Sequence, residues 1–402
     1  MERLCGFNLG NWFSQTEFTP EKASYYAERD LRYVADLGFN FIRLPLDYSF
    51  FEVEPYKYDE ARLCLVDRAV SWASKYGLHL LLDLHVAPGY GIGRSDYSLW
   101  RDQEKQKRTA EIWKYLTRRY RDYGKELAFD LVNEPGGVSD ADLKAFYEKM
   151  IAAIREEDED REIYVEGNEK NRVYASSPVF VKEYKVVYSF HHYEPLWVTH
   201  LGASWAGLAY QMGIRGLRPD YPGKVDLDDL SKEFPSDWFL KYNGVYADKN
   251  WIEGILRPYL ELADGGKTTH CSEFGVFSKM AKRSTALNWY RDVLSIFKEH
   301  GIGWALWNLR GSFGIISTGR DDWMTGKTPW GEPMDSELLS LLRDYARRAL
   351  LSKGTALTHR KAPFSFSSAS SNFSSSGGAR SVEATFFTSK YLLISPRSSL
   401  RE

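Results

Sequence analysis

The sequence predicts an α/β fold, a (β/α)8 TIM barrel with a long insert after the sixth strand. Eight short runs of strand character are spaced along residues 4–308, and amphipathic stretches of helical periodicity lie between them. Repeated strand-then-helix order implies a parallel sheet, and eight such units fit a closed barrel better than an open sheet. No GxGxxG fingerprint follows the first run, which disfavours an open dinucleotide-binding sheet.

The predicted strands follow one another in chain order. They are LCGFN (4–8), FNFIRLP (39–45), HLLLDLH (79–85), LAFDLVN (127–133), EIYVEG (162–167), KVVYSFHHY (185–193), TTHCSEF (268–274) and IGWALWN (302–308). The helical stretches 21–38, 60–77 and 286–301 each end on a glycine, which is typical of a helix stop before the next strand.

Two segments go beyond a minimal barrel. Residues 194 to about 250 contain aromatic residues and turn formers, and because they follow a strand we place them at the C-terminal rim of the barrel. Serine dominates residues 364–376, after the helical periodicity of 335–351 has ended. We therefore predict a barrel domain over residues 1–352 and a loose, serine-rich C-terminal tail over residues 353–402.

The composition is that of a globular protein. The chain has 402 residues, 43% of them hydrophobic, and a formal net charge of −2, so we expect no nucleic-acid partner. No apolar run reaches the ~18 residues of a membrane span, and the N-terminus lacks the features of a signal peptide. We expect a monomer without a membrane partner, either cytoplasmic or secreted with its leader removed.

The cysteines and histidines give no cofactor pattern. Cys5, Cys64 and Cys271 form neither a disulfide framework nor a paired CxxC zinc motif, and we expect them to be small buried residues. Asp83 and His85 could form a metal set with the doublet 191–192, but the HxH pattern with further ligands that is typical of metal-dependent barrel hydrolases is missing. We predict no metal and no cofactor.

Two acidic residues stand where a barrel carries its chemistry, at the C-terminal ends of strands. Glu134 follows the fourth predicted strand, where Pro135 should bias its backbone toward an extended conformation, and Glu273 ends the seventh. One such acid alone is weak support, because 55 acidic residues place some near strand ends by chance. A pair across one barrel mouth is the machinery of glycoside hydrolysis, in which one carboxyl protonates the leaving oxygen and the other attacks the anomeric carbon.

The other strand ends also carry groups that suit a sugar. By the period of two, polar or aromatic residues near the end of a strand share a face with the residue two positions earlier, as Arg43 does with Phe41 and Trp307 with Ala305. The candidate substrate-binding residues at strand ends are Arg43, His85, Asn133, His191, Tyr193 and Trp307.

Taken in order, the motifs GFNLGNW, IRLP, DLH, NEP, HHYEP, SEFG and WALWN resemble the family 5 glycoside hydrolases of clan A, the cellulase-like β/α barrels. The resemblance covers most of residues 4–350. It implies a retaining mechanism with Glu134 as the acid/base and Glu273 as the nucleophile. It also implies the roles of the surrounding residues: Arg43 and Tyr193 hydrogen-bond the nucleophile, Asn133 binds the sugar 2-hydroxyl, His85 and His191 line the subsite of the cleaved sugar, and Trp307 is its stacking floor.

Physical chemistry agrees with these roles. Arg43 beside Glu273 would lower the pKa of the nucleophile, whereas Glu134 needs a raised pKa to begin as an acid. A retaining mechanism also requires the two carboxyl groups to lie about 5–5.5 Å apart, since the ~6.5–9.5 Å of inverting enzymes leaves room for a water.

The substrate is predicted to be a β-linked polysaccharide or oligosaccharide. We expect an endo-β-glycanase for β-1,4- or mixed-linkage glucan. Xylanase or mannanase activity, alone or in addition, is the alternative. An exo-acting enzyme and a non-catalytic carbohydrate-binding barrel are less favoured. The insert should pack beside Trp307 and wall part of the cleft, with Trp197 or Trp205 facing the substrate, because an aromatic face can stack on a pyranose ring.

Overall fold

A computed structural model describes residues 3–169, 176–235 and 237–346. All eight predicted strands are confirmed. They are β1 (Cys5–Asn8), β2 (Phe41–Asp47), β5 (His79–Ala87), β7 (Leu127–Asp130), β8 (Glu162–Glu166), β9 (Val186–His192), β12 (Thr269–Phe274) and β13 (Gly303–Leu306). The predicted tail, residues 353–402, and its boundary near residue 352 lie outside the described residues.

The eight strands close into a parallel barrel. Each pairs with the next along the chain, and the last, β13, returns to β1, which itself pairs with β2. The β2–β5 pairing is the longest, running from Phe41 opposite His79 to Asp47 opposite Val86. This closed ladder confirms the predicted (β/α)8 barrel, because an open sheet would leave two edge strands unpaired.

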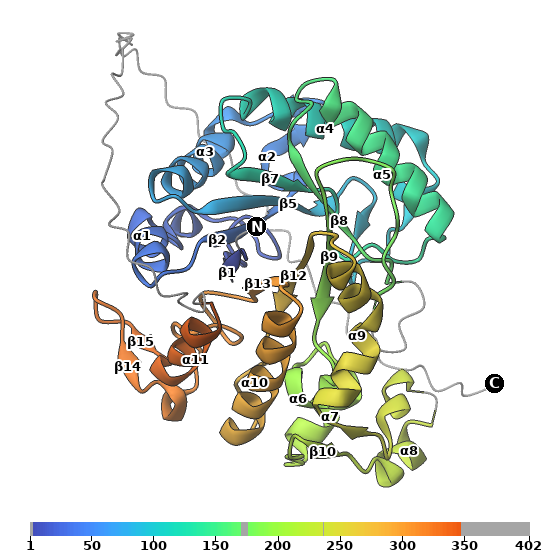
Figure 1. Ribbon diagram of the computed structural model, residues 1–402, viewed down its shortest axis with the longest axis vertical. Coiled ribbons are helices and arrows are strands. Elements are labelled where there is room, and N and C mark those ends of the chain that lie inside the picture. Colours follow the sequence, from blue (N-terminus) through green and yellow to red (C-terminus); the bar gives the residue numbers. More distant parts are fainter. Residues whose placement is uncertain (1–2, 170–175, 236, 347–402) are drawn as a thin grey trace, which may run out of the picture. The chain divides into compact units, whose positions relative to one another are not determined.

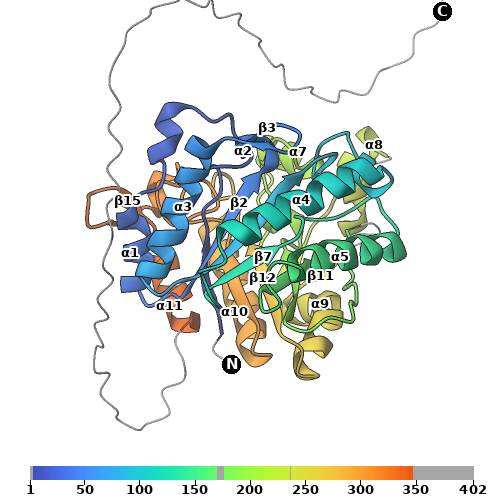
Figure 2. The same ribbon diagram turned by 90° about the horizontal axis from the view of Figure 1, so that it is seen from above.

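Helices cover the outside of the barrel (Figures 1 and 2). They are α1 (Glu28–Asp36), α3 (Glu60–Lys75), α4 (Gln103–Arg119), α5 (Asp140–Arg155), α9 (Lys249–Asp264), α10 (Arg283–Glu299) and α11 (Ser336–Ala346). Asp59, Asp102 and Ser139 accept hydrogen bonds from first-turn N–H groups of α3, α4 and α5, which fixes where these helices begin. Residues 167–169 and 176–185, the described part of the connection from β8 to β9, form no helix.

The insert after the sixth strand is folded. It contains α6 (Leu196–Thr199), α7 (Leu208–Ile214), β10 (Gly223–Lys224), α8 (Asp228–Glu233), the 3₁₀ turn η3 (Trp238–Tyr242) and β11 (Tyr246–Ala247). Figure 1 shows these elements grouped beside α9 and α10.

Other short elements decorate the remaining loops. They are η1 (Pro20–Ser24), α2 (Tyr48–Phe51), β3 (Glu52–Glu54), β4 (Lys57–Tyr58), β6 (Tyr90–Gly91), η2 (Ser98–Trp100), η4 (Asp321–Trp323), β14 (Gly326–Lys327) and β15 (Pro333–Met334). No helix in the described ranges is both long and apolar enough to cross a membrane. Cys5 and Cys271 are buried as expected, but Cys64 is exposed on α3, which corrects the prediction for that residue.

The barrel interior is built in layers. The apolar layer consists of Phe41, Leu81, Ala128, Tyr164, Val187 and Ala305, one residue from each of six strands. Two positions further along five of those strands, on the same face, stands the polar layer: Arg43, Asp83, Asp130, Glu166 and Ser189, all at most 2% exposed. The polar layer therefore rests on an apolar one and lies nearer the C-terminal ends of the strands.

Two histidines lie on the other side of the apolar layer, at the N-terminal ends of the strands. Their rings pack against Phe41, with centroid distances of 5.7 Å for His79 and 4.5 Å for His270. Burial lowers the pKa of His79 to about 4 and that of His270 to about 3. The folded protein therefore holds both rings neutral at pH values where an exposed histidine, with a pKa near 6.5, is already charged.

We expect the free energy of unfolding to decrease as the pH falls from about 6.5 toward 4, because the unfolded chain binds protons that the folded chain excludes. At pH 5 the buried, unprotonated His270 lowers the free energy of unfolding by about 2 kcal/mol relative to a histidine of ordinary pKa. In His270→Gln, the difference in free energy of unfolding between pH 7 and pH 5, measured by urea denaturation, should shrink by about that amount.

The control is His300→Gln, which removes a histidine whose hydrogen bond to Asp264 is open to solvent. This variant should keep the wild-type difference between the two pH values. If His270→Gln kept the wild-type difference, the buried histidines at the N-terminal end of the barrel would not be the cause of the loss of stability at low pH.

Candidate active site

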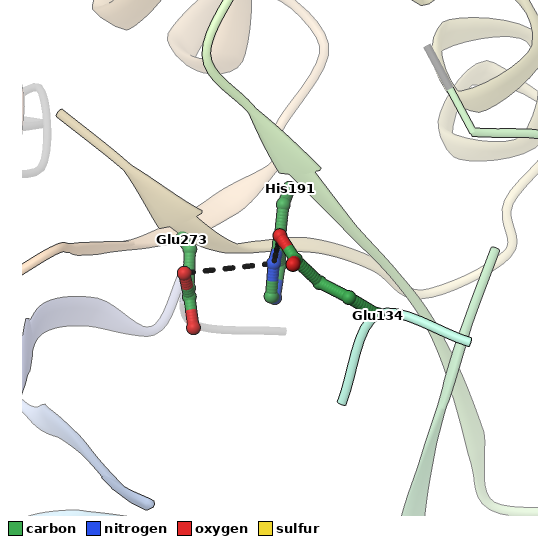
Figure 3. Close-up of side chains that lie close together, drawn as sticks. All are labelled: Glu134, His191 and Glu273. Atoms are coloured by element: carbon green, nitrogen blue, oxygen red, sulfur yellow. Dashed lines mark hydrogen bonds and ion pairs between the residues drawn. The ribbon is translucent and has the colours of Figure 1, made fainter. Parts of the chain in front are cut away.

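The two predicted carboxylates meet at the C-terminal mouth of the barrel. Glu134 follows β7, Glu273 lies near the end of β12, and His191 of β9 stands between them (Figure 3). One ligand atom from each of the three side chains lies within 4.8 Å of the other two. An oxygen of Glu134 is therefore within 4.8 Å of an oxygen of Glu273, a proximity that fits the short carboxyl spacing of retaining enzymes better than the ~6.5–9.5 Å of inverting ones.

The backbone of Glu134 differs from the prediction. Pro135 was expected to favour an extended conformation, but Glu134 has a φ of 43°, in the left-handed region that costs a non-glycine residue about 1–3 kcal/mol. Two hydrogen bonds hold it there. The N–H of Glu134 donates to Glu166 Oε2 at 2.7 Å, and its carbonyl accepts from the Tyr90 hydroxyl at 2.5 Å.

The strand also ends sooner than predicted. β7 stops at Asp130, so Asn133 and Glu134 belong to the segment that follows it. Asn133 still reaches the site: its N–H donates to the carbonyl of Leu84, and its side-chain oxygen accepts from Arg43 Nη2 at 2.8 Å. The side-chain nitrogen of Asn133 can then donate to a sugar hydroxyl.

Glu273 is held by the two residues that the resemblance implied. Arg43 Nη1 donates to Glu273 Oε1 at 2.5 Å, and the Tyr193 hydroxyl donates to Oε2 at 2.9 Å. Burial raises the pKa of Glu273 above its usual value, against the lowering effects of His191 and Arg43. The predicted influence of Arg43 is therefore present, but burial outweighs it in the ligand-free site.

Arg43 is the centre of a buried charge cluster. Its guanidinium is fully buried and lies within 3.1 Å of oxygens of Asp83, Asp130 and Glu166, besides its contact with Glu273. Burial alone would lower the pKa of Arg43, but the surrounding carboxylates, Asp83 foremost, raise it well above the usual value. The surrounding carboxylates thus favour the charged guanidinium, which holds the side chain of Glu273 in position.

Asp130 and Glu166, two buried acids of the polar layer, have pKa values that are shifted in opposite directions. Burial raises the pKa of Asp130 well above its usual range, and the negative charge of Glu166 adds to this. For Glu166, burial acts in the same direction, but His191 and Arg43 outweigh it and leave the pKa below its usual value. A proton shared by this pair is therefore favoured on Asp130 rather than on Glu166.

His191 bridges the acids. Its Nδ1 lies 2.9 Å from Glu134 Oε1 and 3.6 Å from Glu273 Oε2, and its Nε2 lies 3.1 Å from Glu166 Oε1. Burial alone would lower the pKa of His191, but Glu166 and Glu273 raise it well above the usual value. These acids therefore favour the positively charged ring, which is hydrogen-bonded to Glu134 through Nδ1 and lies within ion-pair distance of Glu166 through Nε2.

His85 and Trp307 form another wall of the site. Their rings stack with centroids 5.7 Å apart and an angle of 11° between their planes. Nδ1 of His85 is 2.8 Å from Asp83 Oδ2, and Nε2 is 2.8 Å from the side-chain nitrogen of Gln15. The polar layer thus orients His85 as well as Arg43.

An open cleft of about 400 Å³ begins at Trp307. Among its lining residues are Asn11, Gln15, Phe277, Phe313 and, from the insert, Trp205. Trp205 is 65% exposed, so an aromatic face is accessible beside Trp307.

Trp197 requires a correction. The sequence predicts Trp197 and Trp205 as candidate substrate-binding residues of the insert, but only 1% of the surface of Trp197 is exposed. It lies on α6, which packs against α10, so its ring belongs to the core that attaches the insert to the barrel. A fully buried ring cannot stack on a sugar, and we withdraw Trp197 as a binding residue.

The sequence pattern overlooked several residues of the site. Asp130 and Glu166 stand two positions after inward-facing residues, so the period of two could have found them. Gln15 lies in a loop, and Tyr90 begins the two-residue strand β6, which is too short for a periodic pattern to mark it.

Glu134, His191 and Glu273 are also a donor set of the kind that could hold a metal ion. The charges around them oppose this. Arg43 lies 2.5 Å from Glu273, and His191 is itself held as a cation, so a divalent ion would meet two positive groups and would have to displace the proton of His191. The cluster is better suited to exchanging protons than to coordinating a metal.

A parallel barrel with two carboxylates this close across its C-terminal mouth defines a class of protein, the β/α-barrel glycosidases. The chain belongs to glycosyl hydrolase family 5, the cellulase family, whose model matches residues 6–312. This confirms the resemblance of the motifs. The protein is therefore an O-glycoside hydrolase.

Relatives of known name match over most of their length. Endoglucanase C of Acetivibrio thermocellus is 32% identical over 322 residues, which are 76% of this chain and 91% of that protein. Cellodextrinase A of Ruminococcus flavefaciens is 28% identical over 311 residues, 74% of this chain and 83% of that protein.

Solved structures share the fold. A crystal structure of a glycoside hydrolase aligns with a TM-score of 0.71 and 29% identity, covering 85% of this chain and 99% of that one. The endoglucanase Cel5A of Thermotoga maritima aligns with a TM-score of 0.61 and 21% identity, covering 84% of this chain and 96% of that one.

Proposed function

We propose that this protein is a retaining endo-β-glucanase that cleaves internal β-1,4 bonds of cellulose-like or mixed-linkage glucan. The observation that carries the proposal is the pair Glu134 and Glu273, with carboxylate oxygens within 4.8 Å of each other in a family 5 barrel. The endoglucanase relatives favour glucan over the xylan and mannan alternatives.

In the first step, Glu273 attacks the anomeric carbon and forms a glycosyl ester, while Glu134 gives its proton to the leaving oxygen. Arg43 and Tyr193 each donate a hydrogen bond to Glu273, which aims one of its oxygens at the sugar. Because Arg43 is fixed by the acids of the polar layer, the nucleophile is positioned before the substrate arrives.

In the second step, water replaces the leaving group. Glu134, now ionised, takes a proton from this water, which attacks the ester and frees Glu273. His191 donates to Glu134 Oε1 and stabilises the carboxylate that the first step produces. Three side chains hold the sugar in place. The amide of Asn133 donates to a sugar hydroxyl, the ring of His85 offers a polar edge, and the ring of Trp307 stacks on the sugar.

The protein is proposed to act as a monomer. A substrate panel tests the proposal: the viscosity of a soluble β-1,4-glucan should fall faster than reducing ends appear, and xylan and mannan should be cleaved more slowly. Release of a single small product at constant viscosity would instead indicate an exo-acting enzyme, and preference for xylan or mannan would refute the glucan assignment.

Trp205→Ala should weaken cleavage of the polymer more than cleavage of a short aryl cellobioside. The ring is exposed on the cleft next to Trp307, and stacking on a sugar beyond the cleaved bond contributes only when the substrate extends that far. We expect kcat/KM on polymer to fall about tenfold, which corresponds to about 1.4 kcal/mol of lost binding.

Trp238→Ala is the matched control, because Trp238 is also an exposed tryptophan of the insert, at 53%, but lies outside the lining of the cleft. It should affect neither substrate. An equal effect of Trp205→Ala on both substrates would assign the insert a structural role only.

A further inference from the structure

Glu166, the last residue of β8, touches the catalytic apparatus without facing the substrate. It is 2% exposed, and its two oxygens contact three groups. Oε2 accepts the backbone N–H of Glu134 at 2.7 Å. Oε1 lies 3.0 Å from Arg43 Nη2 and 3.1 Å from His191 Nε2.

The contact with Glu134 meets a specific need. The backbone of Glu134 has a φ of 43°, a conformation that persists only where the surroundings enforce it. Glu166 accepts the N–H of this residue, and Tyr90, the first residue of β6, donates to its carbonyl. Since the direction of a side chain follows from its backbone conformation, these two bonds together aim the Glu134 carboxyl over the barrel mouth.

Through its contact with His191, Glu166 also acts on the carboxyl group of Glu134. The imidazolium ring lies between Glu166 at Nε2 and Glu134 at Nδ1, so the carboxylate of Glu166 fixes the orientation of the ring that in turn contacts the Glu134 carboxyl. Burial raises the pKa of Glu166, but the nearby His191 and Arg43 outweigh it and favour the anionic carboxylate, which attracts both positively charged groups.

We infer that Glu166 is a positioning residue for the acid/base step, which holds the backbone of Glu134 and the ring of His191 so that the Glu134 proton reaches the leaving oxygen. The inference rests on the proposed function. Glu166 acts through Glu134 and contacts neither the sugar nor the reacting atoms. Its loss should therefore impair proton delivery more than attack by Glu273.

Glu166→Gln tests this. The amide keeps the volume of the side chain, but it has one acceptor oxygen in place of two and no charge, so it cannot serve Glu134, Arg43 and His191 together. The readout is kcat/KM over a series of aryl cellobiosides whose leaving phenols differ in pKa, because a good leaving group needs no proton and a poor one does. We expect a loss of about 100-fold with the poorest leaving group and less than about fivefold with the best.

Asp83→Asn is the matched control. Asp83 is an equally buried acid of the polar layer, 3.1 Å from Arg43 and 2.8 Å from His85, and its removal also takes a negative charge from Arg43. The loss of activity in Asp83→Asn should be the same for every leaving group, because Asp83 contacts Arg43, which positions Glu273, and among the described residues it makes no hydrogen bond to Glu134. If Glu166→Gln also loses activity by one common factor, Glu166 acts only through Arg43 or the fold, and the inference is overturned.

Tyr90→Phe provides a second route that does not disturb the charge cluster and serves if Glu166→Gln fails to fold. It removes the other hydrogen bond that holds the Glu134 backbone, so it should show the same dependence on the leaving group at smaller amplitude. A uniform effect of Tyr90→Phe would contradict the backbone part of the inference. Failure of the proposed function is distinguishable, because the wild-type protein would then hydrolyse no aryl cellobioside at all.

Discussion

Glu273→Gln should fold normally and lose turnover on every substrate, by about 10⁴-fold or more. The amide has nearly the same volume and can still meet Tyr193 and Arg43, but it cannot form the glycosyl ester. The measurement is steady-state hydrolysis of a soluble glucan and of an activated aryl cellobioside, with circular dichroism to verify the fold. Retention of more than a few per cent of the activity on any substrate would refute the nucleophile assignment.

Glu162→Gln is the control for this change. Glu162 begins β8, at the opposite end of the barrel from the site, and its carboxyl lies 3.4 Å from the ring of His79. The same chemical substitution there should leave hydrolysis unchanged, because that face of a β/α barrel serves stability and not chemistry.

Glu134→Gln should fail in a different way. With a poor leaving group, the loss should be about 10²- to 10⁴-fold, because protonation of the departing oxygen is no longer assisted. With a good leaving group, the first step should survive, and the glycosyl ester on Glu273 should accumulate because no base activates water. A burst of released phenol followed by slow turnover would reveal this state.

A small anionic nucleophile such as azide gives the confirming result. Azide needs no general base, so it should restore turnover of Glu134→Gln on the activated substrate and yield a glycosyl azide of retained configuration. In Glu273→Gln, azide should not produce that retained product. Equal losses on good and poor leaving groups would contradict the acid/base assignment of Glu134.

The barrel could be predicted because its signals are local and repeated. Each strand is a short apolar run, each of several helices ends on a glycine, and the polar ends of the strands share one parity with the apolar layer beneath them. The family motifs add the candidate carboxylates. The structure brings these two residues together, although β7 ends before Glu134.

What the sequence could not reveal depends on contacts between distant segments. The left-handed backbone of Glu134 contradicts the local effect of Pro135, and it is held by residues 32 and 44 positions away. The burial of Trp197 follows from how α6 packs on α10, which no pattern within the insert encodes. The raised pKa of Glu273 likewise reflects burial, a property of the whole fold.

The layering of the barrel has a consequence for how protons move. Arg43, Asp83 and Asp130 are fully buried, and the apolar layer lies between them and the N-terminal ends of the strands. Glu273 contacts Arg43, and Glu134 reaches the same cluster through His191 and Glu166. We therefore expect protons to enter or leave the cluster chiefly from the C-terminal side. In the proposed double-displacement cycle, the hydrolytic water returns to Glu134 the proton that it gives to the leaving group, so the complete cycle needs no net proton from the cluster below.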